Sequence, residues 1–329
     1  MESVSAIIHL AMNTPRKDLL DRQVQKELQP GIDRVTGMME RCVNYGTHLV
    51  VKCDQAGRQK DVLPVVMLGL HVVELLDSIS VLIRNRCVDP AKILLRSEME
   101  GMFGIEYMAR SDSVRKARQY LVVHAHKRID SYKRFDPTTK AGKQLQAQLN
   151  KDSTFHNLET VCFDTGANIA NLEKMLTRPE YAEVEAEWQR LRGQKSGQIW
   201  WHSLFSGPNR IEELAATVGE HALYQLLYRF YSGESHATNA LDSLHVTQDQ
   251  RPEYQPLRYP LEAPTVAQIA VSMALRTYRA LIDMLVPDEN QSYADWYTRE
   301  IKTDFMELAA FKIVDVGRKS IAPSKRANS

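Results

Sequence analysis

Residues 62–84 read VLPVVMLGLHVVELLDSISVLIR, the most apolar stretch of this 329-residue chain. The run is too long for a single strand, and apolar residues occupy nearly every position. It therefore predicts a helix that is apolar almost all round and buried at the centre of a helical bundle. Pro64 suits the first turn of such a helix, where a missing N–H breaks no helical hydrogen bond.

The segments downstream continue the helical pattern. Asp89 and Pro90 predict an N-cap and a first helical residue, so a second helix is expected from about 89 to 110. The triplet Ser-Asp-Ser at 111–113 separates it from a third helix at about 113–134. Apolar residues that recur at helical spacings predict further helices over 153–177, 211–230 and 264–286.

These patterns predict an all-α multi-helix bundle, about two-thirds helix, with no substantial sheet. Four prolines predict a long loop at 247–264, and a shift to Gly, Ser, Trp and Pro after Gly193 indicates a linker or an ordered loop between subdomains. The chain is accordingly divided into an N-terminal helical segment, two consecutive parts of the bundle, and a C-terminal helix with a basic tail, at residues 1–56, 57–195, 196–290 and 291–329.

The overall composition is that of an ordinary globular protein. Hydrophobic residues make up 43% and charged residues 25%, and 42 Lys plus Arg against 41 Asp plus Glu give a net charge of +1. These values exclude a disordered chain, a collagen-like chain and a small disulfide scaffold. They also show no overall excess of positive charge of the kind that marks many nucleic-acid-binding proteins.

Several classes of site and location are disfavoured by missing patterns. The cysteines form no CxxC or CxH pair, so reduced thiols are expected and a zinc knuckle is not; they are Cys42, Cys53, Cys87 and Cys162. No uncharged run exceeds about fourteen residues, and residues 1–12 lack the basic start of a signal peptide. No Gly-rich phosphate loop is present. We expect a cytoplasmic protein with no membrane segment and no cofactor.

Charged residues inside the predicted helices are the first candidates for function. Glu74 and Asp77 lie within the most apolar helix. Arg96 and Glu100 are one turn apart and share a stripe with Phe103, which predicts that the pair is buried between helices. Such a pair either fixes the register of the helices or orients a substrate or a catalytic histidine. The sequence leaves both interpretations open.

The segment YQLLYRFYSGESHAT, residues 224–238, concentrates polar groups at the end of an apolar helix. Arg229 and His236 are seven residues apart and share one face if the helix continues through Gly233. A guanidinium can bind a phosphate and an imidazole can transfer a proton, so the two form a minimal metal-free phosphodiester site. Alternatively, Gly233 ends the helix and both side chains only complement its C-terminal dipole.

Two runs of sequence carry a resemblance to a known family: HVVELLDSISVLIRNRCVDPAKILLRSEMEGMFGIEYMAR at 71–110, and IWWHSLFSGPNRIEELAATVGEHALYQLLYRFYSGESHAT at 199–238. Together they resemble a bacterial all-helical family of unknown function, numbered five-six-seven-seven. The matching elements are Leu94–Glu100, Trp200–Gly207 and Tyr224–His236, within a match over about 60–290. The family has no established activity.

A more distant resemblance is to the HEPN superfamily of helical ribonucleases and nucleotide-binding proteins, in which four to six residues separate an arginine from a histidine. Here six residues separate Arg229 from His236, and Phe230 stands where many members carry Asn, Asp or His. The resemblance implies that His236 is the general acid or base, that Arg229 stabilises charge on phosphorus, that cleavage leaves a 2′,3′-cyclic phosphate, and that the protein is a homodimer. The residues assigned supporting roles are Arg96, Glu100, Glu234 and Ser235.

A locally basic stretch offers a surface for RNA. Residues 110–134 carry eight Lys or Arg against two acids, with tyrosines between them. The residues assigned to substrate binding are Tyr228, Arg115, Arg118, Lys127 and Arg128. In the opposing interpretation, the stretch is a solvated helix face that the acidic residues of 180–187 neutralise.

Three functions therefore remain. The first is a HEPN-like metal-independent ribonuclease or RNA-binding toxin or defence protein, whose partners would be RNA, a second copy of the chain and an antitoxin or other regulatory protein. The second is a non-catalytic binding or scaffold module. The third is a metal-dependent hydrolase that uses His236, Asp242 and His245 beside Glu234. Activity in EDTA distinguishes the first from the third.

Overall fold

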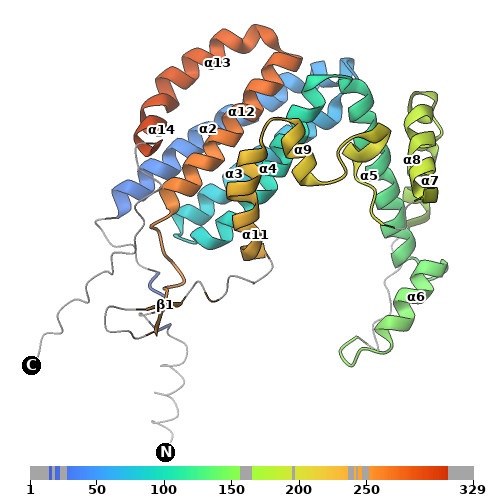
Figure 1. The fold of residues 1–329 in the computed structure, drawn as a ribbon, viewed down its shortest axis with the longest axis horizontal. Helices are drawn as coiled ribbons and strands as arrows, with labels where there is room; N and C mark the ends of the chain where they lie inside the picture. The colour runs from blue at the N-terminus through green and yellow to red at the C-terminus, as the bar shows by residue number, and fades with distance from the viewer. Residues whose placement is uncertain are drawn as a thin grey trace, which may run out of the picture. The chain divides into compact units, whose positions relative to one another are not determined.

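The computed structural model describes residues 15–16, 19–22, 28–155, 165–194, 197–235, 241, 244–246 and 252–309. The chain divides into two compact units that are built from alternating segments (Figure 1). Unit 1 comprises Met1–Ala56, Val66–Glu106 and Ala222–Ser329, and unit 2 comprises Gly57–Val65 and Tyr107–His221. The sequence analysis had divided the chain into four consecutive segments.

Four long helices build most of unit 1, namely α2 (Gln29–Gln59), α3 (Leu63–Arg84), α4 (Val88–Arg110) and α12 (Ala263–Leu285). The all-α prediction is therefore confirmed. Shorter helical segments in this unit are α10 (His221–Leu223), π-helix η3 (Tyr224–Tyr228), α11 (Arg229–Ser235), η5 (Pro287–Glu289), α13 (Asn290–Trp296), π-helix η6 (Tyr297–Ile301) and α14 (Lys302–Ala309). The only strands among the described residues are β1 (Leu244–Val246) and β2 (Pro252–Tyr254), which pair antiparallel.

Side-chain contacts give the directions of the helices. Arg276 of α12 bonds Glu106 of α4 over 2.6 Å, and Lys92 pairs with Glu262 near the start of both helices, so α4 and α12 run parallel. The backbone of α2 passes so close to the Tyr278 hydroxyl that Gly46 leaves no room for a side chain. Figure 1 shows α2 and α12 side by side, with α13 and α14 beside them.

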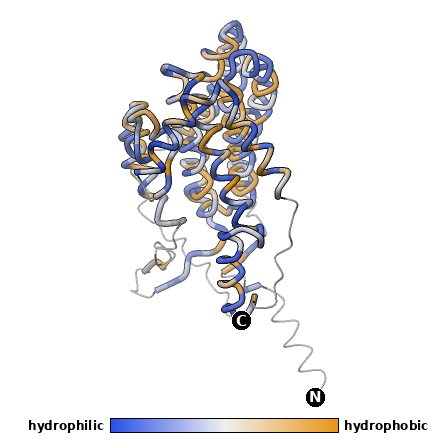
Figure 2. The backbone as a smooth tube through the Cα atoms, turned by 90° about the vertical axis from the view of Figure 1, so that its right-hand side faces the viewer, coloured by the Kyte–Doolittle hydropathy of each residue, from blue (hydrophilic) through white to orange (hydrophobic). Residues whose placement is uncertain are grey.

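The central helix α3 is buried on one side only. Its inner face includes Val72, Leu76 and Ile79, each with no exposed surface, whereas Met67 is 52% exposed. Glu74 and Asp77 also face outward. The prediction of a helix buried all round is therefore wrong, because one face of α3 lies at the surface of its bundle. Hydrophobic and hydrophilic residues alternate along the bundle helices in Figure 2.

Helix α3 is also the one described helix that is long and apolar enough to cross a membrane, judged by length and composition alone. Half of its most apolar window is buried inside the structure. A helix that packs inside a bundle meets the same criterion, and α3 contacts α2, α4 and α12 at Val73, Val72 and Gly69.

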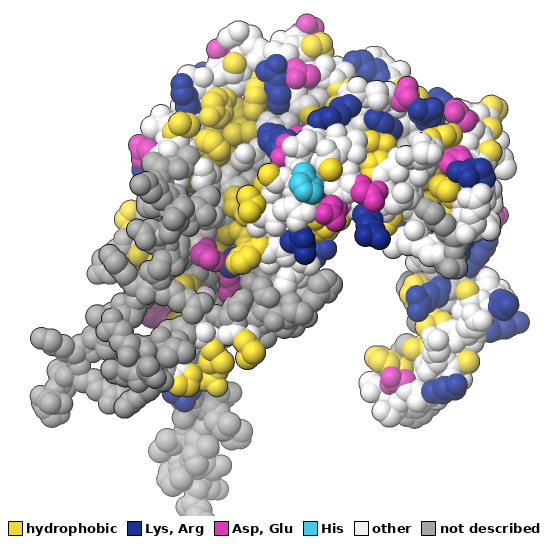
Figure 3. All heavy atoms as spheres, in the orientation of Figure 1, with side chains coloured by type: hydrophobic (Ala, Val, Ile, Leu, Met, Phe, Trp, Pro, Cys, Tyr) yellow, Lys and Arg dark blue, Asp and Glu magenta, His cyan; other side chains and the backbone are white. Residues whose placement is uncertain are grey.

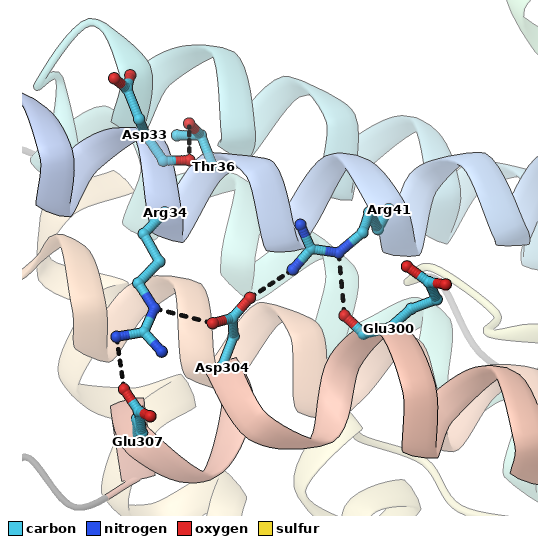
Figure 4. Close-up of polar contacts among 7 residues, drawn as sticks. All are labelled: Asp33, Arg34, Thr36, Arg41, Glu300, Asp304 and Glu307. Atoms are coloured by element: carbon cyan, nitrogen blue, oxygen red, sulfur yellow. Dashed lines mark hydrogen bonds and ion pairs between the residues drawn. The ribbon is translucent and has the colours of Figure 1, made fainter.

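An ion-pair clasp holds α14 against α2 (Figure 4). Asp304 receives hydrogen bonds from Arg34 Nε over 2.8 Å and from Arg41 Nη2 over 2.5 Å, while Arg34 also pairs with Glu307. Burial raises the pKa of Asp304, but the hydrogen bonds from the two arginines outweigh burial and hold the pKa below its usual value. The clasp is therefore charged at neutral pH and weakens as Asp304 gains a proton in acid.

Asp304→Asn is expected to loosen α14 by about 1–2 kcal/mol, because one neutral amide replaces a carboxylate that two guanidiniums share. Hydrogen exchange of the amides at 302–309 should become about tenfold faster. Asp295→Asn on α13 is the matched control, since Asp295 is exposed and accepts a hydrogen bond from Gln291 one turn earlier. Equal exchange in wild type and Asp304→Asn at neutral pH would show that the clasp does not hold α14.

Helix α5 (Ser113–Phe135) is the centre of unit 2. Val122, Ala125 and Ile129 of α5 form one buried cluster with Leu176 and Leu204 from the elements around it. The other helical elements of unit 2 are α6 (Lys140–Leu149), α7 (Thr165–Leu176), η1 (Pro179–Tyr181), α8 (Ala182–Gln194), η2 (Trp201–Ser206) and α9 (Ile211–Thr217). Of the Gly- and Trp-rich segment predicted as a linker or ordered loop, Ile199 and Leu204 thus belong to this core.

Three predicted elements differ from the structure. Residues 151–155 form turns, so the helix expected over 153–177 does not begin at 153; helix is described from Thr165, and residues 156–164 lie outside the described chain. The helix expected over 211–230 is interrupted at Gly219, whose φ of +87° no right-handed helix allows. The proline-rich loop at 247–264 contains the short strand β2.

Candidate functional site

The segment that contains Arg229 is one continuous helical run. Helix α10, π-helix η3 and α11 follow one another without a break from His221 to Ser235, and Gly233 lies inside α11. Gly233 itself therefore does not end the helix, whereas the interpretation in which Arg229 and His236 only complement its C-terminal dipole stays an alternative prediction. The π-helical turn at 224–228 widens the backbone, a feature that is frequent at functional sites.

A polar network joins this run to α4. Arg96 Nη2 donates a hydrogen bond to the Tyr228 hydroxyl over 2.8 Å, and Arg96 Nη1 donates one to Ser232 Oγ over 3.2 Å. Tyr228 in turn donates its proton to Glu100 Oε1 over 2.5 Å. Arg96 Nε is buried without a hydrogen-bond partner among the described residues and lies 4.0 Å from Glu100. We call Arg96, Glu100, Tyr228 and Ser232 the Arg96 network.

Burial differs across the Arg96 network. The Arg96 side chain is 22% exposed and the Glu100 side chain 44%, whereas Tyr228 is 5% exposed. The predicted burial of the Arg96–Glu100 pair is thus only partial, because Glu100 faces solvent on one side. The network supplies one charge of each sign at the surface of α4.

Tyr228 stays protonated at neutral pH. Burial raises the pKa of its phenol, the hydrogen bond and charge of Glu100 raise it further, and Arg96 opposes them only in part. The hydroxyl is therefore a hydrogen-bond donor to Glu100 rather than a base. The Tyr224 ring stacks on the Tyr228 ring with centroids 4.9 Å apart, which further fixes the phenol.

Arg229 lies on the outer side of the same run. Its side chain is exposed, and its Nη1 donates to the neutral amide of Gln225 over 2.9 Å. No carboxylate in the described part of the chain pairs with it, so its charge is available to an anionic ligand. The apolar side chains of Leu226 and Phe230 beside it are also exposed, by 71% and 63%.

The remaining residues of the predicted site are only partly described. His236 lies outside the described residues, as does Asp242 of the alternative metal site. Glu234 and Ser235 belong to α11 by their backbone, but their side chains, like that of His245, are outside the description. The residues that are described contain no group of three or more His, Cys, Asp or Glu side chains that could hold a metal ion.

Most basic side chains of the stretch 110–134 already have partners in the structure. The contacts are Arg110 with the carbonyls of Thr217 and Val218, Arg115 with Asp112 and Glu183, Lys116 with the Tyr107 carbonyl, Arg118 with Asp61, and Lys133 with Glu173. Acidic and basic side chains are interspersed on the face drawn in Figure 3. Lys127 and Arg128, in contrast, contact aromatic rings and no carboxylate of the described chain.

Two residues of interest carried no usable signal in the sequence. Ser232 is an ordinary serine until the structure places it beside Arg96, although its position one turn after Tyr228 could have suggested it. Glu98 lies between Arg96 and Glu100, which were both selected from the sequence. Of these three charged residues, Glu98 is the one with no exposed surface. Local sequence cannot tell which of three neighbouring charges points into a core.

Comparison with known proteins gives one match. The model of a Family of unknown function (DUF5677) matches residues 63–252, which is more than half of the chain. The matched range includes the Arg96 network and Arg229. No curated protein and no solved structure matches the chain.

Proposed function

The chain belongs to the Family of unknown function (DUF5677), and from its own residues we propose that it is a metal-independent, HEPN-like ribonuclease in which Arg229 and His236 act on a phosphodiester bond. The observation that carries the proposal is the continuation of α11 through Gly233. It supports the helical spacing on which the pairing of the two residues depends. Arg229, exposed and without a carboxylate partner in the described chain, is suited to bind phosphate.

The proposed reaction is an internal transfer at phosphorus. His236 accepts the proton of a ribose 2′-hydroxyl, and the 2′-oxygen bonds to the neighbouring phosphorus. The bond from phosphorus to the 5′-oxygen breaks, and that oxygen takes a proton from His236 or from water. Arg229 stabilises the added negative charge on the phosphate oxygens. The products are a 2′,3′-cyclic phosphate and a 5′-hydroxyl end.

The Arg96 network has a positioning role in this proposal. By fixing Tyr228 and Ser232 to α4, it sets the position of the helix that carries Arg229. A second copy of the chain, cytoplasmic RNA and an antitoxin or other regulatory protein belong to the same proposal as partners. Light scattering of the purified full chain tests the dimer.

His236→Ala is expected to lower cleavage of a mixed RNA pool in EDTA by about 10²–10⁴-fold, the usual contribution of a general acid or base. Arg229→Ala should also lower it, and wild-type products should end in a cyclic phosphate. His221→Ala and Arg299→Ala are matched controls on exposed residues and should cleave like wild type.

Three results would contradict the proposal. Wild type that is folded and concentrated but cleaves no RNA would favour the binding module. Cleavage that requires added metal would favour the metal-dependent hydrolase. Cleavage that survives in His236→Ala would remove this histidine from the mechanism.

A further inference from the structure

The segment before and within η2 presents one tryptophan to solvent. Ile199 and Leu204 are buried in the core of unit 2, at 6% and 1% exposure, while Trp200 between them is 40% exposed. The Trp200 carbonyl accepts hydrogen bonds from the N–H and the hydroxyl of Ser203, over 3.0 and 2.8 Å. The backbone that carries the exposed ring is thereby fixed.

Further contacts hold this segment in an unusual conformation. Phe205 and Ser206 have φ values of 53° and 60°, a left-handed region that residues with side chains seldom adopt. Glu187 Oε1 accepts the Phe205 N–H over 3.0 Å, and His202 Nδ1 lies 2.7 Å from the Pro208 carbonyl, to which it donates if it carries the proton. Surrounding contacts maintain such strain only where they over-determine the backbone, and sites of this kind are frequently functional.

Two consecutive cations of α5 have no carboxylate partner in the described chain, and the first of them lies beside the exposed ring. Lys127 Nζ is 5.1 Å from the centroid of Trp200, and Arg128 covers the Tyr132 ring at 4.9 Å. Asp130 is one turn from Lys127 on α5, but these residues of the described chain form no ion pair with each other. Lys127 therefore places one positive charge at Trp200, and Arg128, which also donates to the Tyr132 hydroxyl over 2.6 Å, carries a second charge at the next position of α5. We call Trp200, Lys127 and Arg128 the Trp200 surface.

These positive charges lower the pKa values of two neighbouring histidines. Burial lowers the pKa of His124, and the charges of Arg128 and Lys127 lower it further. Burial likewise lowers the pKa of His202, where the charge of Lys127 acts in the same direction, opposed by the Pro208 carbonyl and Glu213. Both histidines are thus mostly neutral at neutral pH, and the charge of the Trp200 surface comes from Lys127 and Arg128.

We propose that the Trp200 surface binds an unpaired nucleobase of single-stranded RNA together with its phosphate. The base stacks on the Trp200 ring in place of the Lys127 ammonium, and Lys127 and Arg128 contact the phosphate oxygens. An exposed aromatic ring beside a cation that pairs with no carboxylate of the described chain is an arrangement that binds single-stranded nucleic acids. The positive charge disfavours a cationic ligand, and a single exposed ring offers little apolar area for insertion into a membrane.

The choice of RNA rests on the proposed function, but binding is measured separately from cleavage. Full-length His236→Ala protein is titrated with a fluorescent single-stranded oligonucleotide of about twelve nucleotides, near the site size of such surfaces. Adding Trp200→Leu is expected to weaken binding about tenfold, whereas Trp200→Phe, which keeps a stacking ring, should stay within about threefold. Phe155→Leu, on another exposed ring of unit 2, is the matched control and should bind like the parent.

The charge is tested by salt dependence. The double variant Lys127→Ala and Arg128→Ala should lower the slope of log affinity against log salt by about 1.4, the value for two lost phosphate contacts on a single strand. The same change at the exposed pair Lys140 and Lys143 of α6 should leave the slope unchanged.

The remaining arms identify the source of the ligand. Equal affinity for the oligonucleotide and for a free nucleoside monophosphate would assign the surface to mononucleotides. Binding only to vesicles of acidic phospholipid would assign it to membranes. Either result would overturn the proposal. RNA affinity that is unchanged in Trp200→Leu, with Trp200→Phe confirming the fold, would also overturn it. RNA binding that depends on Trp200, without cleavage by wild type, would overturn the proposed function alone.

Discussion

Glu98→Gln is expected to stabilise the protein by an amount that grows as the pH rises. Glu98 on α4 has no exposed surface, and neither carboxyl oxygen has a hydrogen-bond partner among the residues described. Burial raises the pKa of Glu98 well above its usual value. The folded protein therefore keeps this carboxyl group protonated over a pH range in which the unfolded chain releases the proton.

The sign of the pH dependence follows from this difference. A raised pKa in the folded state contributes stability that is complete below the pKa of an unfolded glutamate, about 4.3, and that is lost as the pH rises toward the folded value. Within that window, wild type should lose about 1.4 kcal/mol of unfolding free energy per pH unit through this group. The glutamine variant has no proton to release, so the difference between the two proteins widens with pH.

Urea unfolding followed by circular dichroism, at several values between about pH 4 and pH 8, measures the difference. Glu74→Gln is the matched control on α3, because the Glu74 side chain is 73% exposed; it should differ from wild type by less than about 0.5 kcal/mol at every pH. A constant difference between Glu98→Gln and wild type, or a variant less stable at the highest pH, would contradict the buried, protonated carboxyl. Cys42 and Tyr278 lie within reach of its charge, but burial raises the pKa of both, so neither ionises in this range.

Arg96→Leu is expected to cost about 2–3 kcal/mol of unfolding free energy and to reduce the proposed cleavage of RNA. The change removes two hydrogen bonds from a charged donor and the contact of the guanidinium with the Tyr228 ring, 4.4 Å from its centroid. It also removes the guanidinium that lies 4.0 Å from Glu100. Arg279→Leu is the control, since Arg279 is 55% exposed and pairs with Asp283 one turn later on α12; it should cost less than about 0.5 kcal/mol.

A double-mutant cycle with Tyr228→Phe separates the network from general packing. If Arg96 and Tyr228 act through one network, the two losses together should fall short of their sum by about 1 kcal/mol. For a positioning residue, kcat should fall while KM stays within about threefold, at a temperature where all variants are folded. Additive stability losses with unchanged kcat would leave the Arg96 network a structural contact only.

The helices that stand between clear end signals were predictable. Pro264 and the Asp-Ser pair before α5 placed α12 and α5 within one or two residues of their observed bounds. The helix over 211–230 failed because its apolar spacing continues across Gly219, where the backbone turns. Spacing reports which residues share a face only while the helix persists, and a single positive φ resets it.

The candidate site was predictable in its residue types but not in its contacts. Arg96, Glu100 and Tyr228 were each selected from sequence, and the structure brings them together across more than 120 residues of chain. The exposure of Trp200 was not predictable, because Trp200 is left exposed between buried Ile199 and buried His202 only once the segment packs on α5. Partners of the basic residues of α5, such as Asp61 and Glu173, likewise come from distant segments.

The late position of α12 in the chain has a consequence for synthesis on the ribosome. Helices α2, α3 and α4 emerge first, but α12, which completes their core, follows only after residues 111–262, which include most of unit 2, have been made. Synthesis proceeds at about 5–20 residues per second. The apolar inner faces of α2, α3 and α4 therefore lack their partner α12 for roughly 8–30 seconds. Unit 2 can fold in that interval, whereas the nascent first bundle is the part of the chain that a chaperone would have to shield.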